Sequence, residues 1–261
     1  MSNAATVLNN PYTIEGQVAL ISGAGGAIGG AIAEVFARSG GAKIALADLP
    51  GNRRHHELAE SLRADGFEAV AVDGDITQEA EVKALVERVV SDLGAIDVLV
   101  NNAGIANNTP FWETTFDDWQ RGLRVHLDGT YLLTRAVVDS MRERKRGSII
   151  QMSSIAAQQG ASTGDAAYST AKAGLQGFTK TLAQTLGPLG IRANAIAPGV
   201  VDTPLLHSVH DDESLGRLLQ RTPLRSIIQP ENIATVALFL ASPGSWQVTG
   251  QTIDVGGMVM R

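Results

Sequence analysis

Short apolar runs alternate with longer amphipathic stretches along most of this chain of 261 residues. The short runs are rich in valine, isoleucine and alanine and predict buried strands, whereas the longer stretches carry apolar residues three or four positions apart, as helices do. The predicted strands cover residues 18–21, 43–47, 69–72, 98–100, 148–152 and 191–196. The predicted helices cover residues 31–38, 55–64, 79–93, 116–144 and 166–186.

The alternation of strand and helix predicts a fold of the α/β class. Strands separated by helices of about ten or more residues need crossover connections, which make the strands parallel and cover both faces of the sheet. We therefore expect a doubly wound parallel sheet of the Rossmann type, in three layers of helix, sheet and helix. No linker or repeat divides the chain, so we expect one domain over residues 1–261, with residues 1–13 as an N-terminal arm.

The composition fits one soluble globular domain and argues against several kinds of partner. Hydrophobic residues make up 44% of the chain and charged residues 18%, which allows a large core. The formal net charge is −6 with no basic stripe, so we expect no nucleic-acid partner. There is no cysteine, and hence no disulfide and no thiolate metal site. We find no secretion signal and no run of about 18 apolar residues, so we expect a cytoplasmic protein without a membrane partner.

A glycine-rich turn joins the first predicted strand to the first helix. Gly23 and Gly29 would let backbone N–H groups approach a pyrophosphate at the N-terminus of that helix. Asp48 ends the second strand, where a carboxylate accepts hydrogen bonds from the adenosine ribose and repels a 2′-phosphate. The pattern therefore predicts NAD rather than NADP, although Arg53 and Arg54 are near enough in sequence to keep NADP open. A Walker-type phosphate loop is excluded, because no Lys-Ser or Lys-Thr follows the glycines.

Tyr168 and Lys172 lie four residues apart in the predicted helix 166–186, so their side chains share one face. An ammonium beside a phenol favours the phenolate and lowers the phenol pKa from about 10 toward the working pH. That would make Tyr168 a usable proton donor or acceptor in redox chemistry on a C–O bond. Such a pair alone is weak evidence for a catalytic function, since tyrosine and lysine occur at this spacing on helix surfaces by chance.

With these motifs in place, the chain resembles the short-chain dehydrogenase/reductase family from about residue 14 to its C-terminus. The family pattern Thr-Gly-x-x-x-Gly-x-Gly appears as Ser22 to Gly29, with Ala27 in place of the middle glycine. The family motif Asn-Asn-Ala-Gly appears at residues 101–104, after the fourth strand. Several motifs in the right order are specific, and the resemblance implies an NAD(P)-binding oxidoreductase.

The resemblance also assigns roles to residues. It implies that Tyr168 exchanges a proton with the substrate oxygen, that Lys172 lowers the pKa of Tyr168 and holds the nicotinamide ribose, and that Ser154 hydrogen-bonds the substrate oxygen. The spacing to Tyr168 favours Ser154 over Ser153. The implied cofactor contacts are Ser22, Gly23, Gly25, Ala27, Ile28, Gly29, Asp48, Asp75, Ile76, Asn102, Ala103, Gly104, Tyr168, Lys172, Pro198, Gly199, Val201 and Thr203.

The fourth catalytic position departs from the family pattern. The family usually has asparagine in the long helix, in a context such as Val-Asn-Leu-x-Gly, whereas this chain has Val-His-Leu-Asp-Gly around His126. In the family this asparagine helps a water molecule to reach the lysine. Our hypothesis is that His126 keeps this path, because an imidazole both donates and accepts hydrogen bonds. The alternative is a buried histidine without a catalytic role.

The sequence also contains patterns that resemble a hydrolase nucleophile and a metal site. Ser162 lies in a Gly-x-Ser-x-Gly pattern of the kind found in hydrolases, and Asp202 and His207 follow it in the right order. A nucleophile elbow needs a strand directly before the serine, however, and this segment has the character of a loop. His207 and His210 stand three apart near acidic residues, but they fit a polar lid better, so we expect no metal site.

Residues 204–228 correspond to the segment that closes over the substrate in the family. Its leucines favour an apolar or moderately polar alcohol or ketone as the small-molecule substrate. Trp112 and Trp119 flank the start of the long helix and are candidates for the pocket lining or the core. By the same resemblance we expect a homotetramer, built through the long helices and a C-terminal strand within residues 248–257.

These observations predict an NAD-dependent alcohol dehydrogenase or carbonyl reductase that acts on a secondary alcohol or its ketone, with Tyr168 as general acid and base. Two alternatives stay open. One is a 3-oxoacyl reductase of the same family, which the net negative charge disfavours because an acidic carrier protein would prefer a basic surface. The other is a protein that binds NAD as a sensor without turnover, if His126 has disabled the proton path.

Overall fold

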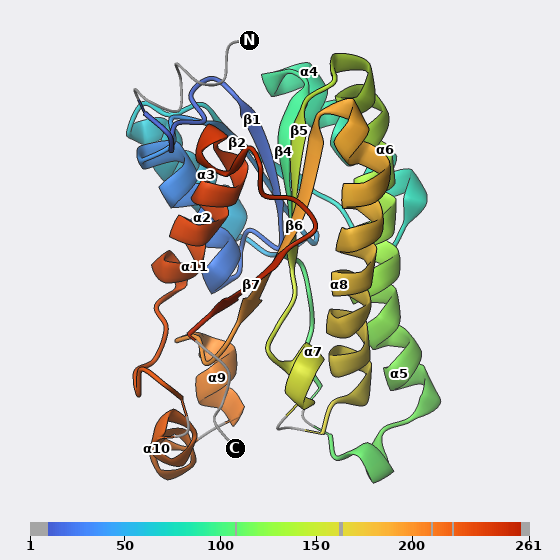
Figure 1. Cartoon of the computed structure of the whole chain (residues 1–261), viewed down its shortest axis with the longest axis vertical. Coiled ribbons are helices and arrows are strands. Elements are labelled where there is room, and N and C mark those ends of the chain that lie inside the picture. The colour runs from blue at the N-terminus through green and yellow to red at the C-terminus, as the bar shows by residue number, and fades with distance from the viewer. Residues whose placement is uncertain (1–9, 108, 162–163, 210, 221, 257–261) are drawn as a thin grey trace.

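The computed structural model describes residues 10–107, 109–161, 164–209, 211–220 and 222–256, and a seven-stranded parallel sheet forms its centre (Figure 1). The strands are β1 (Val18–Ser22), β2 (Lys43–Asp48), β3 (Ala69–Asp73), β4 (Ile96–Asn101), β5 (Gly147–Met152), β6 (Ile191–Pro198) and β7 (Thr252–Val255). They lie in the order β3, β2, β1, β4, β5, β6, β7, and every neighbouring pair is parallel. The six predicted strands are confirmed, and β7 forms one edge of the sheet.

Helices connect the strands and cover both faces of the sheet. They are α2 (Ala27–Arg38), α3 (Arg54–Ala64), α4 (Glu79–Leu93), α5 (Phe116–Leu123), α6 (Gly129–Arg144), α7 (Ala156–Gln159), α8 (Ala166–Leu186), α9 (Pro204–Val209), α10 (Asp212–Gln220) and α11 (Pro230–Ala241). Short 3-10 turns occur at η1 (Phe111–Glu113), η3 (Gly187–Leu189) and η4 (Pro243–Ser245). Among the described helices, none combines the length and the apolar character that a membrane crossing requires.

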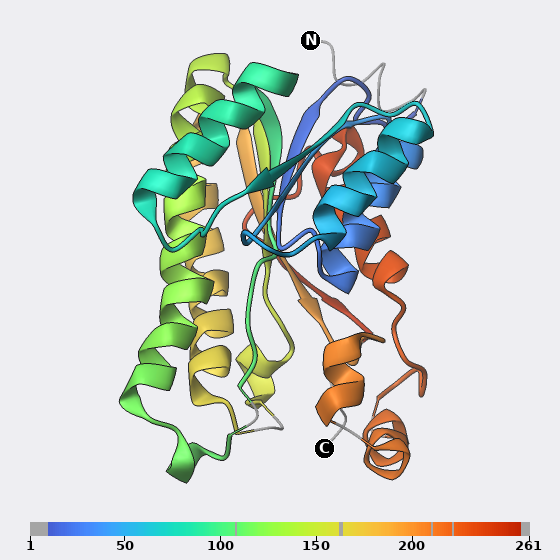
Figure 2. The ribbon, with the colours of Figure 1, turned by 180° about the vertical axis from the view of Figure 1, so that it is seen from behind.

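Two apolar cores, one on each face of the sheet, hold the layers together. On one face α2, α3 and α11 pack against the strands and bury residues such as Phe36 and Leu62. On the other face α4, α6 and α8 do the same with residues such as Leu85 and Leu133. Figures 1 and 2 show the two helical layers on opposite sides of the sheet. Helices on both faces of the sheet confirm the predicted three-layer architecture. The apolar surface that they bury is the main stabilising term in such a fold.

The order of the strands reverses between β1 and β4, and this reversal determines where a ligand can bind. The chain winds from β1 to β2 and β3 on one side of the sheet, and from β4 to β7 on the other. Connections that leave a parallel sheet in opposite directions open a crevice beyond the carboxyl ends of the strands. The turn after Ser22 and the segment after Asn101 meet at this point.

The long helix predicted over residues 116–144 is interrupted. A π-helical segment at Arg124–Asp128, which contains His126, separates α5 from α6. Such a segment accommodates one extra residue in a helical turn and is frequently found at functional sites. The apolar period continues across the interruption, so the sequence pattern alone does not reveal it.

The C-terminal half of the chain contains helices that the sequence pattern did not predict. The largest of them, α11, buries Ile233, Ala237 and Leu240 in the core. A proline stands at its first turn, and Gln229 and Asn232 form a capping box at its start. These are recognised start signals of a helix, so the information was present in the sequence.

Candidate active site

A pocket of about 1110 Å³ opens at the carboxyl ends of the strands, where the crevice is expected. It is lined by the turn after β1, by the ends of β2 to β6 and by residues of α5, α8, α9 and α10. All of the predicted catalytic and cofactor residues line this pocket except Ser22 and Gly29. The structure therefore brings together residues that lie between positions 23 and 203 of the sequence.

The glycine turn after β1 is shaped by close backbone contacts. Gly23 has a φ of +67°, and a Cβ atom on it would lie 2.7 Å from the Cα of Ala103. Gly29 is equally crowded, because a Cβ atom there would collide with the carbonyl group of Gly23. At the start of α2, Gly26 provides no side-chain cap, so the first N–H groups of the helix remain available to an anion. Gly29 thus acts through helix packing and not as part of the pocket wall.

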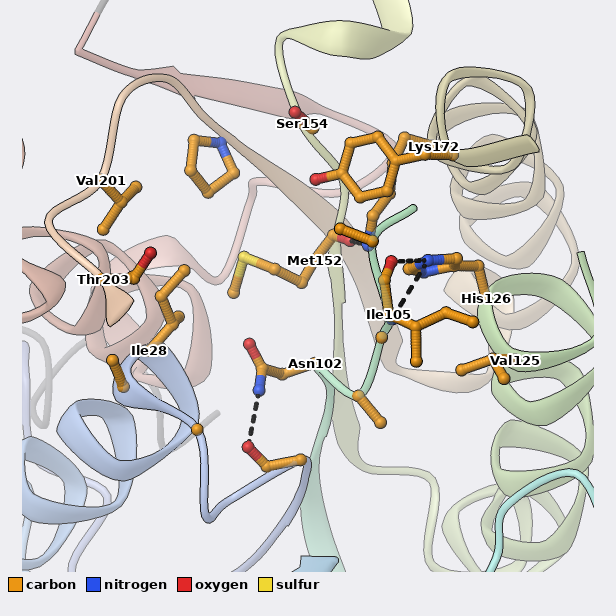
Figure 3. Close-up of a pocket in the computed structure, with 18 of the residues that line it drawn as sticks. Ile28, Asn102, Ile105, Val125, His126, Met152, Ser154, Lys172, Val201 and Thr203 are labelled. Atoms are coloured by element: carbon orange, nitrogen blue, oxygen red, sulfur yellow. Dashed lines mark hydrogen bonds between the residues drawn. The ribbon is translucent and has the colours of Figure 1, made fainter. Parts of the chain in front are cut away.

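Ser22 supports the pocket from behind. Its Oγ accepts hydrogen bonds from the backbone N–H groups of Asn102 and Ala103, each at 3.1 Å. In return, the Asn102 side chain donates to the carbonyl oxygens of Ser22 and Gly23 at 3.1 Å, and Figure 3 draws one of these two bonds. These four bonds fasten the turn after β1 to the end of β4.

Asp48 is fixed at the rim of the pocket. Its Oδ2 accepts the N–H of Gly25 and its Oδ1 accepts the N–H of Leu49, both at 2.8 Å. The carboxylate therefore stands directly beside the glycine turn. Asn52, which the sequence analysis did not single out, lies against Gly25 and lines the pocket, as does Arg54. No motif identifies Asn52, because its position depends on how the loop between β2 and α3 folds.

Asp75 and Ile76 form another part of the wall, beyond the end of β3. The Asp75 carboxylate accepts the N–H of Thr77 at 2.9 Å, and the Asp75 N–H donates to Glu81 at 2.8 Å. Ile76 is buried against Gly129, where a Cβ atom would come within 2.7 Å of the isoleucine side chain.

Tyr168 and Lys172 share one face of α8, as predicted. The Nζ of Lys172 lies 5.4 Å from the centre of the Tyr168 ring and donates to the carbonyl oxygen of Met152 at 2.7 Å. The lysine is buried, and burial lowers its pKa to about 7. Asp165 starts the helix: its carboxylate accepts the N–H of Tyr168 at 2.9 Å and the N–H of Asn107 at 2.8 Å. This cap was not singled out beforehand, although aspartate three residues before Tyr168 is a typical N-cap signal.

The pKa of Tyr168 differs from the expectation. Burial raises it, the hydrogen bond with Ser154 lowers it, and the negative charge of Asp165 raises it further. The expected lowering by Lys172 does not dominate, because the same burial that raises the tyrosine pKa also disfavours the lysine cation. Burial therefore favours a neutral phenol beside an amine whose pKa is about 7.

The two candidate serines have different surroundings. The Ser154 Oγ lies in the pocket, and Figure 3 shows it on the wall near Lys172. It accepts the N–H of Ala156 at 3.1 Å. Ser153 is directed to α8 instead, where its Oγ donates to the carbonyl oxygen of Lys172 at 2.8 Å and accepts from Gln176 at 3.2 Å. This geometry agrees with the preference for Ser154.

His126 is buried in the π-helical segment. Its Nε2 lies 2.7 Å from the carbonyl oxygen of Ile105 and 3.4 Å from the Ile105 nitrogen (Figure 3). The short contact assigns the proton to Nε2. Its ring meets the Tyr168 ring edge-on with the centres 5.3 Å apart. Burial, together with the charge of Lys172, lowers the pKa of His126 to about 3, so the imidazole is neutral.

The segment after β6 forms the opposite wall. Figure 3 shows Val201 and Thr203 across the pocket from His126 and Lys172. Pro198 and Gly199 also line the pocket, and the Pro198 carbonyl accepts the N–H of Ile155 at 3.1 Å.

The expected lid contains α9 and α10. A bridge between Val201 and Ile228 closes the base of this segment. Leu206 and Leu218 line the pocket. The expectation that tryptophans line it or join the core is wrong, because Trp112 is 82% exposed, Trp119 is half-buried and neither borders the pocket.

The described part of the chain tests the two rival sites only in part. A helix, α7, precedes residue 160 where a nucleophile elbow requires a strand, and Ser162 itself lies outside the described residues. His207 and Asp202 do form a pair, with Nε2 and Oδ1 2.6 Å apart, but both are partly exposed. His210 also lies outside the described residues.

Comparisons with known proteins agree with this geometry. A family model described as enoyl-(acyl carrier protein) reductase matches residues 23–258. The chain is 38% identical to a 3-oxoacyl-[acyl-carrier-protein] reductase of Synechocystis over 246 residues, which cover 94% of this chain and 97% of that protein. It is 35% identical to the 7alpha-hydroxysteroid dehydrogenase of Escherichia coli over 244 residues, which cover 94% of each.

Solved structures show the same likeness. A 7alpha-hydroxysteroid dehydrogenase complexed with NADH and 7-oxo glycochenodeoxycholic acid superposes with a TM-score of 0.90 at 34% identity, over 96% of both chains. A putative gluconate dehydrogenase from Agrobacterium tumefaciens superposes with a TM-score of 0.89 at 31% identity, over 95% of this chain and 97% of that one.

Replacing Lys172 by Met tests the burial of the amine. A lysine with a lowered folded pKa binds its proton more weakly than in the unfolded chain, so wild-type stability rises with pH between about 7 and 10.5. We therefore expect the Lys172→Met variant to have a higher free energy of unfolding than the wild type below pH 7. The expected difference is about 1–3 kcal/mol, a value that already allows for the lost hydrogen bond to Met152. The difference should shrink toward pH 10. Urea denaturation without cofactor at pH 6, 8 and 10 measures this.

The matched control is Lys180→Met, since Lys180 is exposed on the same helix. Its effect on stability is expected to be small at every pH. A Lys172→Met variant whose stability relative to the wild type does not change with pH would show that the buried amine is not destabilising.

Proposed function

The chain belongs to the short-chain dehydrogenase/reductase family of oxidoreductases, and from this membership we propose that it transfers a hydride between NAD(H) and a secondary alcohol or its ketone, with Tyr168 as general acid and base. One observation carries the proposal: Tyr168 and Lys172 lie on one face of α8, with the Lys172 Nζ 5.4 Å from the centre of the Tyr168 ring, and both line the same pocket as the glycine turn and Asp48.

The residues present fit a dinucleotide. Gly23 lets the turn after β1 lie directly against Ala103, and the uncapped start of α2 offers N–H groups to a pyrophosphate. Asp48 stands where it would accept the ribose hydroxyls, and Asn102 and Thr203 line the path toward Ser154. When bound, the nicotinamide supplies or accepts the hydride. Asp48 is the reason for proposing NAD over NADP, because a carboxylate held beside the glycine turn repels a 2′-phosphate.

Three side chains would carry out the proton transfer and position the substrate oxygen. Burial keeps Tyr168 protonated, so its hydroxyl is ready to give a proton to a carbonyl oxygen during reduction. Ser154 would hydrogen-bond the same oxygen and position it. Lys172, with a pKa near 7, can gain or lose a proton at physiological pH and so compensate a charge on Tyr168.

His126 is proposed to act by position and not by titration. With a pKa of about 3 the imidazole is neutral near physiological pH. Its Nε2–H holds the Ile105 carbonyl at 2.7 Å, and its ring supports that of Tyr168. The asparagine that the family usually has at this place could make the same bond, since an amide also donates.

The substrate is proposed to be an apolar or moderately polar alcohol or ketone. Leu206 and Leu218 reach the pocket from the lid, and Ile155 and Met152 add further apolar surface. A second candidate is a 3-oxoacyl thioester, because a relative at 38% identity is named as a 3-oxoacyl-[acyl-carrier-protein] reductase. The net charge of −6 works against docking of an acidic carrier protein.

The proposed assembly is a homotetramer, by likeness to the family. Tyr131 on α6 is 54% exposed and contacts Phe178 on α8, which leaves apolar surface on the outer face of the two long helices. Sedimentation equilibrium measures the mass. Four times 27.4 kDa supports the tetramer, and a mass of 27.4 kDa contradicts it.

Replacing Tyr168 by Phe should abolish most turnover, because the variant has no proton to exchange with the substrate oxygen. We expect kcat to fall about 100- to 10,000-fold, as is typical when a general acid is lost. The measurement uses the best substrate from a panel of secondary alcohols, ketones and 3-oxoacyl thioesters, and NADH binding is followed by fluorescence. Tyr131→Phe is the control, since Tyr131 is exposed on α6. A Tyr168→Phe variant with wild-type kcat would refute the proposed role, and NADH binding by the wild type without turnover on any panel member would favour the sensor alternative.

The same kinetics across pH decide the role of His126. We expect His126→Ala to lower kcat about 10- to 100-fold through misplacement of the Ile105 loop, and His126→Asn to retain more activity. Neither variant should move the limbs of the pH–rate profile, because the histidine does not titrate in that range. Full activity of His126→Ala would remove the residue from the mechanism.

Replacing Asp48 by Ser tests the choice of cofactor. Two like charges about 4 Å apart repel by about 1 kcal/mol in water and about 4 kcal/mol near a protein surface, so the ratio of kcat/KM for NAD to that for NADP should fall about 5- to 800-fold. Asp117→Ser is the control, as Asp117 is exposed on α5 and lies away from the pocket. An unchanged ratio in Asp48→Ser would mean that other groups set the preference.

A further inference from the structure

Two histidines and an aspartate converge outside the pocket. His55 and His56 stand in the first turn of α3, and Asp73 is the last residue of β3. The Nε2 atoms of both imidazoles lie 3.0 Å from the same carboxylate oxygen, Oδ1 of Asp73. None of the three side chains lines the pocket, so the proposed reaction gives no reason for this arrangement.

The convergence of these imidazoles departs from ordinary helix geometry. Consecutive residues of a helix point about 100° apart, so their side chains do not face each other. Here the ring centres of His55 and His56 are 4.2 Å apart. The donor atoms of the two histidines and Asp73 all lie within 4.8 Å of one another, and over the described ranges of the chain no other three histidine or acidic residues come together in this way.

Two imidazole nitrogens and one carboxylate oxygen are a donor set that divalent transition metals prefer. Zn²⁺ binds such donors at about 2.0–2.2 Å, which places the donors of a tetrahedral site about 3.3 Å apart. The observed separations of 3.0 Å between each Nε2 and Oδ1 are close to this value. Only small shifts of the side chains and transfer of each ring proton from Nε2 to Nδ1 would therefore be needed to admit an ion.

Burial divides the cluster into a rigid part and an open part. The side chain of His55 is fully buried, and its Nδ1 has no hydrogen-bond partner in the described structure, so Asp73 is the polar group to which this ring is directed. His56 and Asp73 are 47% and 46% exposed. An ion can therefore enter from solvent and retain water as a further ligand, while the buried ring holds one ligand in place.

We propose that His55, His56 and Asp73 form a binding site for a divalent transition-metal ion such as Zn²⁺, with water completing its coordination. The sequence did not predict this site, because the histidines that it suggested as metal ligands were His207 and His210. Asp73 lies in another element, seventeen residues beyond His56, and only the parallel pairing of β2 and β3 brings its carboxylate to the start of α3.

The site is joined to the cofactor pocket through the backbone. Asp73 pairs in register with Asp48, and the N–H of Gly74 donates to the Asp48 carbonyl at 2.9 Å. A metal ion would link the start of α3 to the end of β3 and so fix the loop between β2 and α3, which carries Asn52 to the pocket wall. The ion would therefore have a structural role, and its site lies beside one end of the pocket.

The experiment uses the full-length protein without an affinity tag, stripped of metal with a chelator. Zn²⁺ binding is measured by calorimetry, and Co²⁺ binding by its visible absorption. We expect one ion per chain, and we expect His56→Gln and Asp73→Asn to weaken binding at least about tenfold. His56 is partly exposed, so its replacement leaves the core intact and keeps the test valid if Asp73→Asn folds poorly.

The matched control is His207→Gln. His207 is also an exposed imidazole bonded to a carboxylate, that of Asp202, and among the residues that the structure describes it belongs to no cluster of three metal-ligand side chains. Its variant should bind Zn²⁺ as the wild type does. The proposal is overturned if the wild type shows no saturable binding, if His56→Gln binds with wild-type affinity, or if His207→Gln is the variant that loses the ion.

Discussion

The contact between the turn after β1 and the end of β4 is the constraint on which the site depends. The two segments are fastened by hydrogen bonds from Asn102 and Ala103 to the Ser22 hydroxyl, and from the Asn102 side chain back to the turn. They can approach this closely because Gly23 has no Cβ, which would lie 2.7 Å from Ala103. If these segments were further apart, the glycine turn and the face of α8 that carries Tyr168 and Lys172 would border two crevices. Their contact makes them the walls of a single pocket.

Burial then determines the electrostatics of that pocket. Lys172, His126 and Asp165 are all buried, and each is tied to a backbone group: the carbonyls of Met152 and Ile105, and the N–H groups at the start of α8. These bonds fix the side chains on different elements before any ligand binds, which is the preorganisation that catalysis requires. The same burial disfavours charge, so the pKa of Lys172 falls to about 7 while that of Tyr168 rises. Negative charge on a ligand would favour the ammonium form of Lys172, and the ammonium would in turn favour the phenolate.

Much of the fold and of the site could be predicted from the sequence, because both follow from local patterns. Apolar runs of strand length fixed β1 to β6, and the spacing of Tyr168 and Lys172 placed them on one face of α8. What could not be predicted depends on contacts between distant segments. The sequence shows neither the π-helical turn around His126 nor the position of Asn52 against Gly25. The pKa of Tyr168 was expected to fall because the spacing reveals a neighbour but does not reveal how deeply both groups are buried.

The histidine at the fourth position shows how one residue can replace another when the backbone provides the partner. The bond that matters runs from His126 to the Ile105 carbonyl, and any side chain with a donor at that distance can make it. An imidazole is larger than an amide, so it also needs space. Gly104 provides this space, since a Cβ atom there would lie 2.5 Å from the His126 ring. The ring must also remain neutral next to Lys172, and its burial ensures this. The glycine that ends the Asn-Asn-Ala-Gly motif therefore explains why a histidine fits beside Tyr168 without displacing the loop that borders the pocket.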